Sequence, residues 1–277
     1  MQKKGSKEKY RRIIKRKIFW EKHRNSIMTL GLLLILALAL GGTILWRSIE
    51  ARKEEGEIRQ RLSRIKAGDG FSQSLCMTDP DAIPAYLGED WVTLGGGMPG
   101  FCIYDLQNVT GENYSALDAL GRCGSAMVML HKSMMPDKER ESIGEIKPTG
   151  WVQHKYEGVV ASNPPYLYNR CHLIAYALTG QNANERNLIT GTRHFNADGM
   201  LPWEIKVMEY LEKYDNHVLY RVTPYFKGDE LLARGVEMEA YSVEDAGKGV
   251  CFHVFVYNVQ PGIEIDYATG ENRLAEE

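Results

Sequence analysis

An unbroken apolar run near the start of the chain is its strongest hydrophobic pattern. Residues 26–46 contain no charged side chain and consist mostly of Leu, Ile, Ala and Gly. A helix needs about 20 such residues to cross a bilayer, so the run predicts one transmembrane helix. A secretory signal peptide is the alternative, but its apolar core is shorter and ends at small residues. This run continues through Leu45 and Trp46 to Arg47, which favours an anchor.

Two periodicities later in the chain predict a helix and a sheet. Apolar residues recur every three or four positions over 200–214, the spacing of one helix face: Leu201, Ile205, Met208 and Leu211. Apolar and polar residues alternate over 217–226, 235–243 and 251–259, as in half-buried strands. A shorter helix is expected over 115–120. Successive strands without intervening helices predict an α+β domain with an antiparallel sheet core.

Charge divides the chain into four segments. Residues 1–25 hold eleven basic and two acidic side chains. Basic excess marks the cytoplasmic side of a cell membrane, so this tail is expected inside and residues 71–277 outside, as one extracytoplasmic domain behind a single-pass helix at 26–46. Residues 47–70 carry dense mixed charge and predict a solvated stalk or linker. A short coiled coil that joins two copies into a homodimer is the alternative.

The extracytoplasmic domain is acidic, which restricts what it can bind. The whole chain has a net charge of −2, of which the tail contributes +9 and residues 47–66 contribute +3, so residues 67–277 carry −14. A surface of this sign does not favour broad adhesion to polyanions. Any nucleic-acid site would therefore be a local basic patch.

Side chains suited to phosphodiester hydrolysis are concentrated within residues 168–204. This segment holds a histidine that follows a polar and a basic residue, and then two asparagines and a glutamate: Asn169, Arg170, His172, Asn187, Asn196 and Glu204. They supply a general base, a cation, a hard oxygen ligand and a carboxylate. An amide oxygen suits Mg²⁺ or Mn²⁺ better than Zn²⁺, so the pattern predicts hydrolysis with one such ion.

The segment reading YNRCHLIAYALTGQNANERNLITGTRHFNADGMLPWE resembles the DNA/RNA non-specific endonucleases with a ββα-metal site. The resemblance is greatest to the branch that includes the membrane-anchored streptococcal competence nuclease. It extends from about Ile83 to Tyr267 and includes LDALGRCG around Arg122. It implies a ββα-metal nuclease site, cleavage of both DNA and RNA, one Mg²⁺ ion and products with 5′-phosphate ends.

The resemblance also assigns roles to individual residues. His172 matches the general base that activates water, and Asn196 matches the one protein ligand to Mg²⁺. Asn187 matches an asparagine that holds the metal site or the phosphate, and Glu204 matches the acid that orients metal-bound water. Each has a structural alternative: His172 as a core histidine, Asn196 as a helix cap and Glu204 as a first-turn acid.

Three arginines are candidates for contact with the substrate. Arg170 and Arg122 match basic residues of the family that contact the scissile or a neighbouring phosphate. Arg193 is a further candidate, from its place near Asn196. An ion pair with a carboxylate is the alternative for Arg122, and an ordinary surface charge is the alternative for Arg193.

Two residues depart from the family motif, which reads Asp-Arg-Gly-His. Asn169 stands where the aspartate is expected, and an amide keeps some of the hydrogen bonds that a carboxylate makes to substrate but not its charge. Cys171 stands where the glycine is expected and would be disfavoured at a positive φ. A thiol beside the base suggests redox control, with a packed small side chain as the alternative.

Together these patterns predict a membrane-anchored, metal-dependent, sequence-non-specific endonuclease that hydrolyses DNA and RNA outside the cell. Mg²⁺ is the expected cofactor and Mn²⁺ the alternative. Two other classes remain open. A non-catalytic nucleic-acid receptor on the same fold is supported by Asn169. An exported toxin-like effector would be favoured by a neighbouring immunity protein or a secretion signal, and neither is visible in the sequence.

Overall fold

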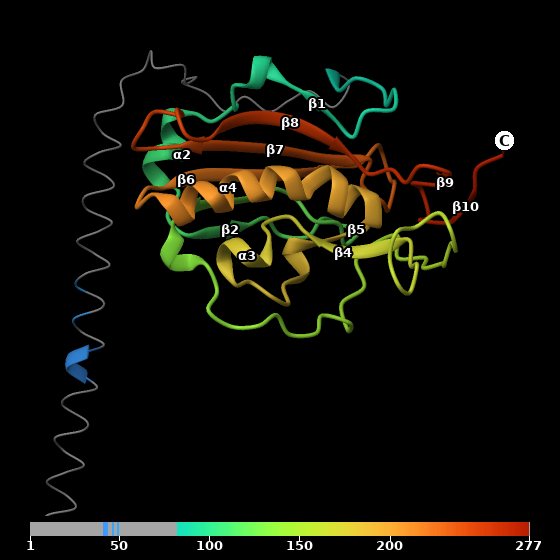
Figure 1. The fold of residues 1–277 in the computed structure, drawn as a ribbon, viewed down its shortest axis with the longest axis horizontal. Coiled ribbons are helices and arrows are strands. Elements are labelled where there is room, and N and C mark those ends of the chain that lie inside the picture. The colour runs from blue at the N-terminus through green and yellow to red at the C-terminus, as the bar shows by residue number, and fades with distance from the viewer. Residues whose placement is uncertain (1–40, 44–45, 47–48, 50–81, 277) are drawn as a thin grey trace, which may run out of the picture. The chain divides into compact units, whose positions relative to one another are not determined.

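The computed structural model describes residues 41–43, 46, 49 and 82–276, and the chain divides into two compact units, Met1–Ile58 and Arg59–Glu277 (Figure 1). The predicted cytoplasmic tail, most of the predicted transmembrane helix and nearly all of the stalk lie outside the described residues. Among the residues that are described, no helix combines the length and apolar character needed to cross a membrane. The fold described below is that of residues 82–276.

A six-stranded antiparallel sheet forms the centre of this region. From one edge to the other its strands are β1 (Trp91–Thr93), β8 (Cys251–Tyr257), β7 (Gly235–Ser242), β6 (Val218–Tyr225), β3 (Ala126–Leu130) and β2 (Glu112–Tyr114). The three long strands β6, β7 and β8 fall where the alternating pattern predicts them, so the prediction of an α+β fold with an antiparallel sheet core is confirmed.

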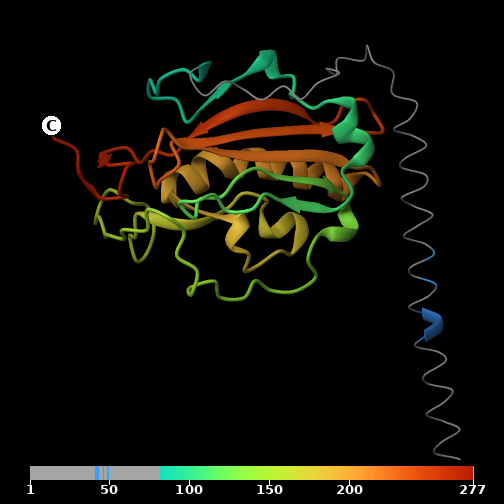
Figure 2. The same cartoon turned by 180° about the vertical axis from the view of Figure 1, so that it is seen from behind.

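One face of the sheet packs against helix α4 (Leu201–Lys213). This helix lies in front of the long strands in Figure 1 and behind the sheet in Figure 2, which shows the reverse side. Val207 and Leu211 of the helix share one apolar cluster with Tyr220 and Val222 of β6, and all four are buried. The helix predicted over 200–214 is therefore confirmed, but the packed face is formed by Val207, Tyr210 and Leu211, whereas Leu201 and Ile205 of the predicted apolar face are exposed.

The opposite face of the sheet buries charge instead of exposing it. Arg221 Nε donates to Glu239 Oε2 at 2.6 Å, and His253 Nε2 lies 2.5 Å from Glu237 Oε1. Residues 82–108, with η2 (Gly95–Gly97) and α2 (Ile103–Asn108), supply further partners, because Gly100 N donates to Glu239 Oε1 at 2.6 Å. Every residue of β7 is buried. The polar positions that predicted half-buried strands are thus internal ion pairs rather than solvent contacts.

The short helix predicted over 115–120 is wrong. These residues form a turn in which Asp118 Oδ1 accepts from the backbone N–H groups of Leu120 and Arg122, each at 2.9 Å. Asp and Ser side chains that bind nearby N–H groups compete with helix formation. Ser115 also donates to the Ser125 carbonyl rather than capping a helix.

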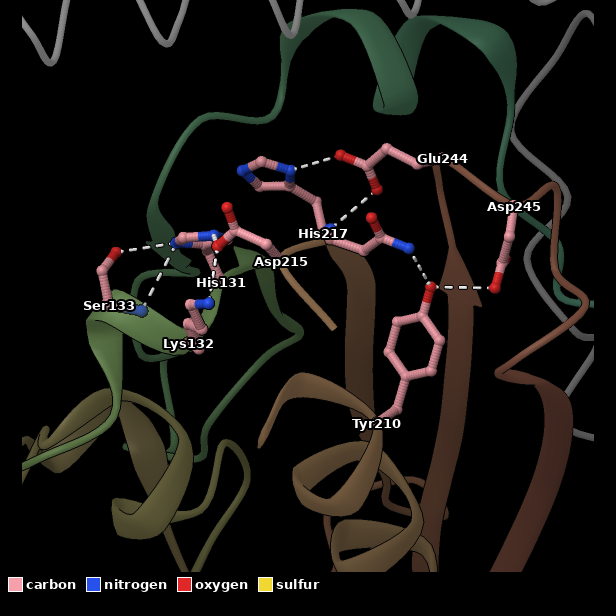
Figure 3. Close-up of polar contacts among 9 residues, drawn as sticks. His131, Lys132, Ser133, Tyr210, Asp215, His217, Glu244 and Asp245 are labelled. Atoms are coloured by element: carbon pink, nitrogen blue, oxygen red, sulfur yellow. Dashed lines mark hydrogen bonds and ion pairs between the residues drawn. The ribbon is translucent and has the colours of Figure 1, made fainter. Parts of the chain in front are cut away.

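Polar contacts fix the end of α4 to the end of the sheet (Figure 3). Tyr210 of α4 donates to Asp245 at 2.9 Å, beyond the end of β7. His217, just before β6, meets Glu244 at 2.6 Å, and its ring stacks on that of His131 at 4.7 Å. These contacts lie near the C-terminal end of α4 and fix the direction of the helix. The candidate site lies at the other end, at the start of the helix.

Candidate active site

Two short strands and the helix that follows them form a ββα unit. Strand β4 (Tyr168–His172) pairs antiparallel with β5 (Leu188–Thr192), and the chain then enters a π-helical turn, η5 (Phe195–Met200), that continues into α4. The strands and helix are in close contact at Gly191. A Cβ there would lie 2.6 Å from Cys171 Sγ and 2.5 Å from the Phe195 ring, so this position requires glycine.

His172 ends β4 and its ring orientation is fixed by the backbone. Its Nε2 lies 2.9 Å from the carbonyl oxygen of Asn182, which can only accept, so Nε2 carries the proton. In the neutral ring Nδ1 then has a free lone pair, and Nδ1 lies 3.3 Å from Nη2 of Arg140. Burial, together with the charge of Arg140, lowers the pKa of His172 from 6.5 to about 4. The imidazole is therefore a neutral acceptor at physiological pH.

Asn187 holds the turn that follows His172. Its side chain accepts from Ile174 N at 2.8 Å and donates to Ile174 O at 3.0 Å, and its own carbonyl accepts from Leu173 N at 2.9 Å. The residue is fully buried at the end of η4 (Glu185–Asn187) and does not line the cleft described next. Because the side chain is buried outside the cleft and bonds both backbone groups of Ile174, Asn187 positions the turn after the base rather than touching substrate.

A cleft of about 820 Å³ brings most of the predicted site residues together. Its lining includes six of them, from β4, from the residue after β5, and from η5 and α4: Asn169, Arg170, His172, Arg193, Asn196 and Glu204. Its volume is in the range that buries a small organic ligand. The basic patch expected on an acidic domain is present, because three arginines line this cleft and Glu204 is the one acidic residue among the lining side chains.

Asn196 and Glu204 project into the same cleft because of the irregular start of the helix. In a regular α-helix, residues eight positions apart point about 80° away from one another. The π-helical turn that contains Asn196 is wider, so each residue advances less around the axis and the two side chains come closer to alignment. The π-helical turn thus places the Asn196 amide and the Glu204 carboxylate on one wall of the cleft.

The Glu204 carboxylate is held in a destabilising environment. Burial raises its pKa from 4.5 to about 7, and the charge of Arg140 opposes that rise. Within the described part of the chain no hydrogen bond or ion pair engages this carboxylate. An unpaired, desolvated carboxylate beside an amide oxygen is a hard donor set, which suits a divalent cation such as Mg²⁺. The residues present therefore fit the metal that the family implies.

Arg140 is the site residue that the sequence pattern did not reveal. It comes from the long connection between η3 (Lys132–Met134) and β4, 32 positions before His172. Its guanidinium lies 3.3 Å from His172 Nδ1, and its charge acts to lower the pKa values of both His172 and Glu204. Its neighbours in the sequence are mostly charged, and no pattern distinguishes this arginine from a solvated one.

The three arginines predicted to meet substrate have different surroundings. Arg170 lines the cleft, but its guanidinium donates to the carbonyls of Ile146 and Gly144 and stacks on the Trp151 ring at 4.3 Å. Arg193 lines the cleft as predicted.

Arg122 lies outside the cleft. It pairs with Asp118 at 2.7 Å and donates to the carbonyls of Gly228 and Glu230. The alternative of an ion pair with a carboxylate is the one that the structure supports, and the structure does not bring Arg122 together with the other candidate residues.

The two departures from the family motif have different consequences. Asn169 lines the cleft, so an amide stands where the family has a carboxylate. Cys171 is fully buried, and Ala246 is the one non-glycine residue with positive φ in the described part of the chain. Burial raises the pKa of the Cys171 thiol far above 9. Such a thiol is unreactive, so the packed side chain is favoured over redox control.

Comparison with known proteins identifies the family. Residues 103–244 match the model of the DNA/RNA non-specific endonuclease domain, which is half of the chain. The chain therefore belongs to the DNA/RNA non-specific endonuclease family, and the family predicted from residues 168–204 is confirmed.

The relatives with the most informative matches are streptococcal nucleases. A deoxyribonuclease of Streptococcus dysgalactiae subsp. equisimilis is 34% identical over 110 residues, which is 38% of this chain and 32% of that protein. The chain thus matches about a third of that relative's length. NucA from Streptococcus agalactiae, solved with magnesium bound, superposes with a TM-score of 0.57 at 25% identity, over 66% of this chain and 87% of that one. Sda1 nuclease with bound zinc gives 0.55 at 25% identity, over 68% and 97%.

Proposed function

We propose that this protein is a divalent-metal-dependent endonuclease that hydrolyses phosphodiester bonds of DNA and RNA without sequence specificity. The observation that carries the proposal is the orientation of His172. Its Nε2 is committed to the Asn182 carbonyl, and its Nδ1 lone pair is directed toward Arg140 in a cleft shared with Asn196 and Glu204. A base, a cation and hard oxygen donors on one cleft are what phosphodiester hydrolysis requires.

His172 acts as the general base. Nδ1 accepts a proton from the attacking water, and the Nε2–H bond to the Asn182 carbonyl stabilises the imidazolium that results. The guanidinium of Arg140 must leave Nδ1 before water can reach it. A phosphate in the cleft offers this guanidinium stronger, charge-assisted hydrogen bonds, so substrate binding itself would free the base.

Asn196 would hold the divalent cation, with Glu204 as the neighbouring carboxylate. When bound, this cation would neutralise charge on the phosphate and stabilise the leaving oxygen. Mg²⁺ is proposed because the donors are hard oxygens, and the magnesium-bound NucA structure is consistent with that choice. The proposed contacts are to phosphate groups, which DNA and RNA share, so they would not depend on base sequence. Cleavage would leave 5′-phosphate ends.

The deciding experiment is digestion of a plasmid and of an RNA by the full chain, with Mg²⁺ or with EDTA. His172→Ala should abolish cleavage in the presence of Mg²⁺, and Asn196→Ala should abolish it by weakening metal binding. His154→Ala is the matched control, because His154 is exposed and lies outside the cleft. A folded His172→Ala protein that cuts at the wild-type rate would exclude this assignment of the base. No cleavage by folded wild-type protein with Mg²⁺ or Mn²⁺ would favour the receptor alternative.

The proposed location is the cell membrane, with the tail inside and the nuclease domain outside. This rests on the uncharged run at 26–46 and the eleven basic residues before it. Cells expressing the full chain should retain nuclease in the membrane fraction and lose it to added protease without lysis. Deletion of residues 26–46 should move the activity out of that fraction. Self-association through residues 47–70 stays a prediction.

A further inference from the structure

The cleft is lined by aromatic side chains as well as by charged and polar groups. Four aromatic residues line it: Trp151, Tyr166, Tyr168 and Tyr176. They come from β4, from the segment before β4 and from the start of α3 (Tyr176–Thr179), rather than from the helix that carries Asn196. The catalytic proposal gives no role to these aromatic side chains.

Three of these four aromatic residues are less exposed than the fourth and make contacts within the protein. Tyr168 is buried and donates to the Gly270 carbonyl at 2.9 Å. Tyr176 donates to the Lys138 carbonyl at 2.9 Å, and Trp151 carries the Arg170 guanidinium over its ring. Tyr166 differs, because 41% of its surface is exposed.

Tyr166 is exposed on a fixed backbone. It forms a β-bridge with Lys155, and its N–H donates to the Pro164 carbonyl at 2.9 Å. The next residue, Leu167, is fully buried and donates to the His154 carbonyl at 3.0 Å. Because neighbouring side chains in extended backbone point to opposite sides, burial of Leu167 directs Tyr166 away from the interior.

A cation lies behind the Tyr166 ring. Lys155 Nζ is 4.9 Å from the ring centroid, within the range of a cation–π contact. Tyr166 lines the cleft and Lys155 does not, and the tyrosine is 41% exposed, so its ring remains accessible from the cleft beside the ammonium. An aromatic face beside a positive charge is the arrangement on which bases of single strands stack next to their phosphates.

The charge of the cleft makes such a contact useful. Residues 67–277 carry a net charge of −14, and the guanidiniums of Arg140 and Arg170 already have partners in the protein. Contact with a phosphate would therefore require Arg140 to leave His172, and Arg193 is the other cleft arginine that could meet it. Stacking adds affinity without reading sequence, because every base has a π face.

We propose that Tyr166 is the stacking platform for one unpaired base of the substrate strand, so that the protein prefers single-stranded to duplex nucleic acid. A base inside a duplex is covered on both faces by its neighbours and cannot stack on a side chain until it is extruded. This inference rests on the proposed function, since it places the strand that the site would cleave.

The test is binding of short fluorescent DNA to the full chain in EDTA, followed by fluorescence anisotropy. Three probes are compared: a single strand, the same strand with abasic sites, and its duplex. Tyr166→Ala should raise the Kd for the single strand by about 5- to 150-fold and change the other two little. Tyr166→Phe should bind like wild type because the ring remains.

Tyr104→Ala serves as the control, because Tyr104 is a 70% exposed tyrosine on α2, outside the cleft. An unchanged Kd in Tyr166→Ala, an equal loss on the abasic strand, wild-type affinity for duplex equal to that for single strand, or no measurable binding of the single strand would each overturn the inference.

Cleavage of the same probes with Mg²⁺ separates this inference from the proposed function. Wild-type protein that binds the single strand through Tyr166 but never cuts it would contradict the nuclease and not the stacking. Wild-type protein that cuts, with Tyr166→Ala unchanged in affinity and in KM for the single strand, would contradict the stacking alone.

Discussion

Replacing Glu204 by glutamine removes a negative charge that the fold holds in an unfavourable place. Burial raises the pKa of this carboxyl from 4.5 to about 7. Above pH 7 the carboxyl is ionised in both the folded and the unfolded chain. Burial of this charge costs free energy only in the folded chain. Below pH 4.5 it is protonated in both states and this penalty is absent.

The size of the effect on the free energy of unfolding follows from the pKa shift of Glu204. A displacement of the pKa from 4.5 to about 7 corresponds to roughly 3 kcal/mol of free energy of unfolding at pH 8. The sign is set by proton binding, because the folded chain binds more protons than the unfolded chain between the two pKa values. Stability from this group therefore falls as pH rises from 4.5 to 7. Glu204→Gln should be more stable than wild type by roughly 3 kcal/mol at pH 8 and by under about 1 kcal/mol at pH 5.

Urea unfolding of both proteins at pH 5 and pH 8, in EDTA, measures this difference. Titration of His172 is common to the two proteins and cancels in the comparison. Mg²⁺ added at pH 8 should stabilise wild type and leave Glu204→Gln unchanged, while the variant loses cleavage activity. A stability difference that is the same at both pH values would refute the reasoning, because it would show that Glu204 is not desolvated.

Three further substitutions test other parts of the site. Arg140→Ala should lower kcat about 100-fold and raise the pKa of His172, whose value the guanidinium lowers; pH profiles and NMR titration of the ring measure both. Asn187→Ala should lower the free energy of unfolding by about 3 kcal/mol in urea, since it leaves the buried N–H and carbonyl of Ile174 without partners. Asn169→Asp should lower the Mg²⁺ concentration for half-maximal cleavage by about tenfold, and an unchanged midpoint would place residue 169 outside the influence of the metal.

The sequence predicted the sheet and the long helix because their patterns are local. Alternation marked β6, β7 and β8, and a repeat of three to four residues marked α4. It could not show that the polar positions of β7 are buried, since Glu237 and Glu239 find their partners on β6 and β8. It also misread residues 115–120, where one aspartate side chain takes the N–H groups that a helix would need.

The residues of the candidate site also divide into those that the sequence could reveal and those that it could not. Residues on the ββα unit, such as His172, Asn196 and Glu204, could be found because their order along the chain reflects one continuous structural unit. Arg140 could not, since a long connection with no periodicity brings it to the cleft. Asn187 was found for its place in the motif, but its task is set by backbone groups two residues beyond the base.

Burial moves the two titrating groups of the cleft in opposite directions, and this separates their tasks. It lowers the pKa of His172 to about 4, so the base is neutral throughout the physiological range. It raises the pKa of Glu204 to about 7, so near neutrality the carboxyl is held between its two forms. Arg140 strengthens the first shift and weakens the second. The base is therefore unprotonated with or without substrate, whereas the charge of Glu204 depends on a cation in the cleft, and binding of that cation would decide when the site is complete.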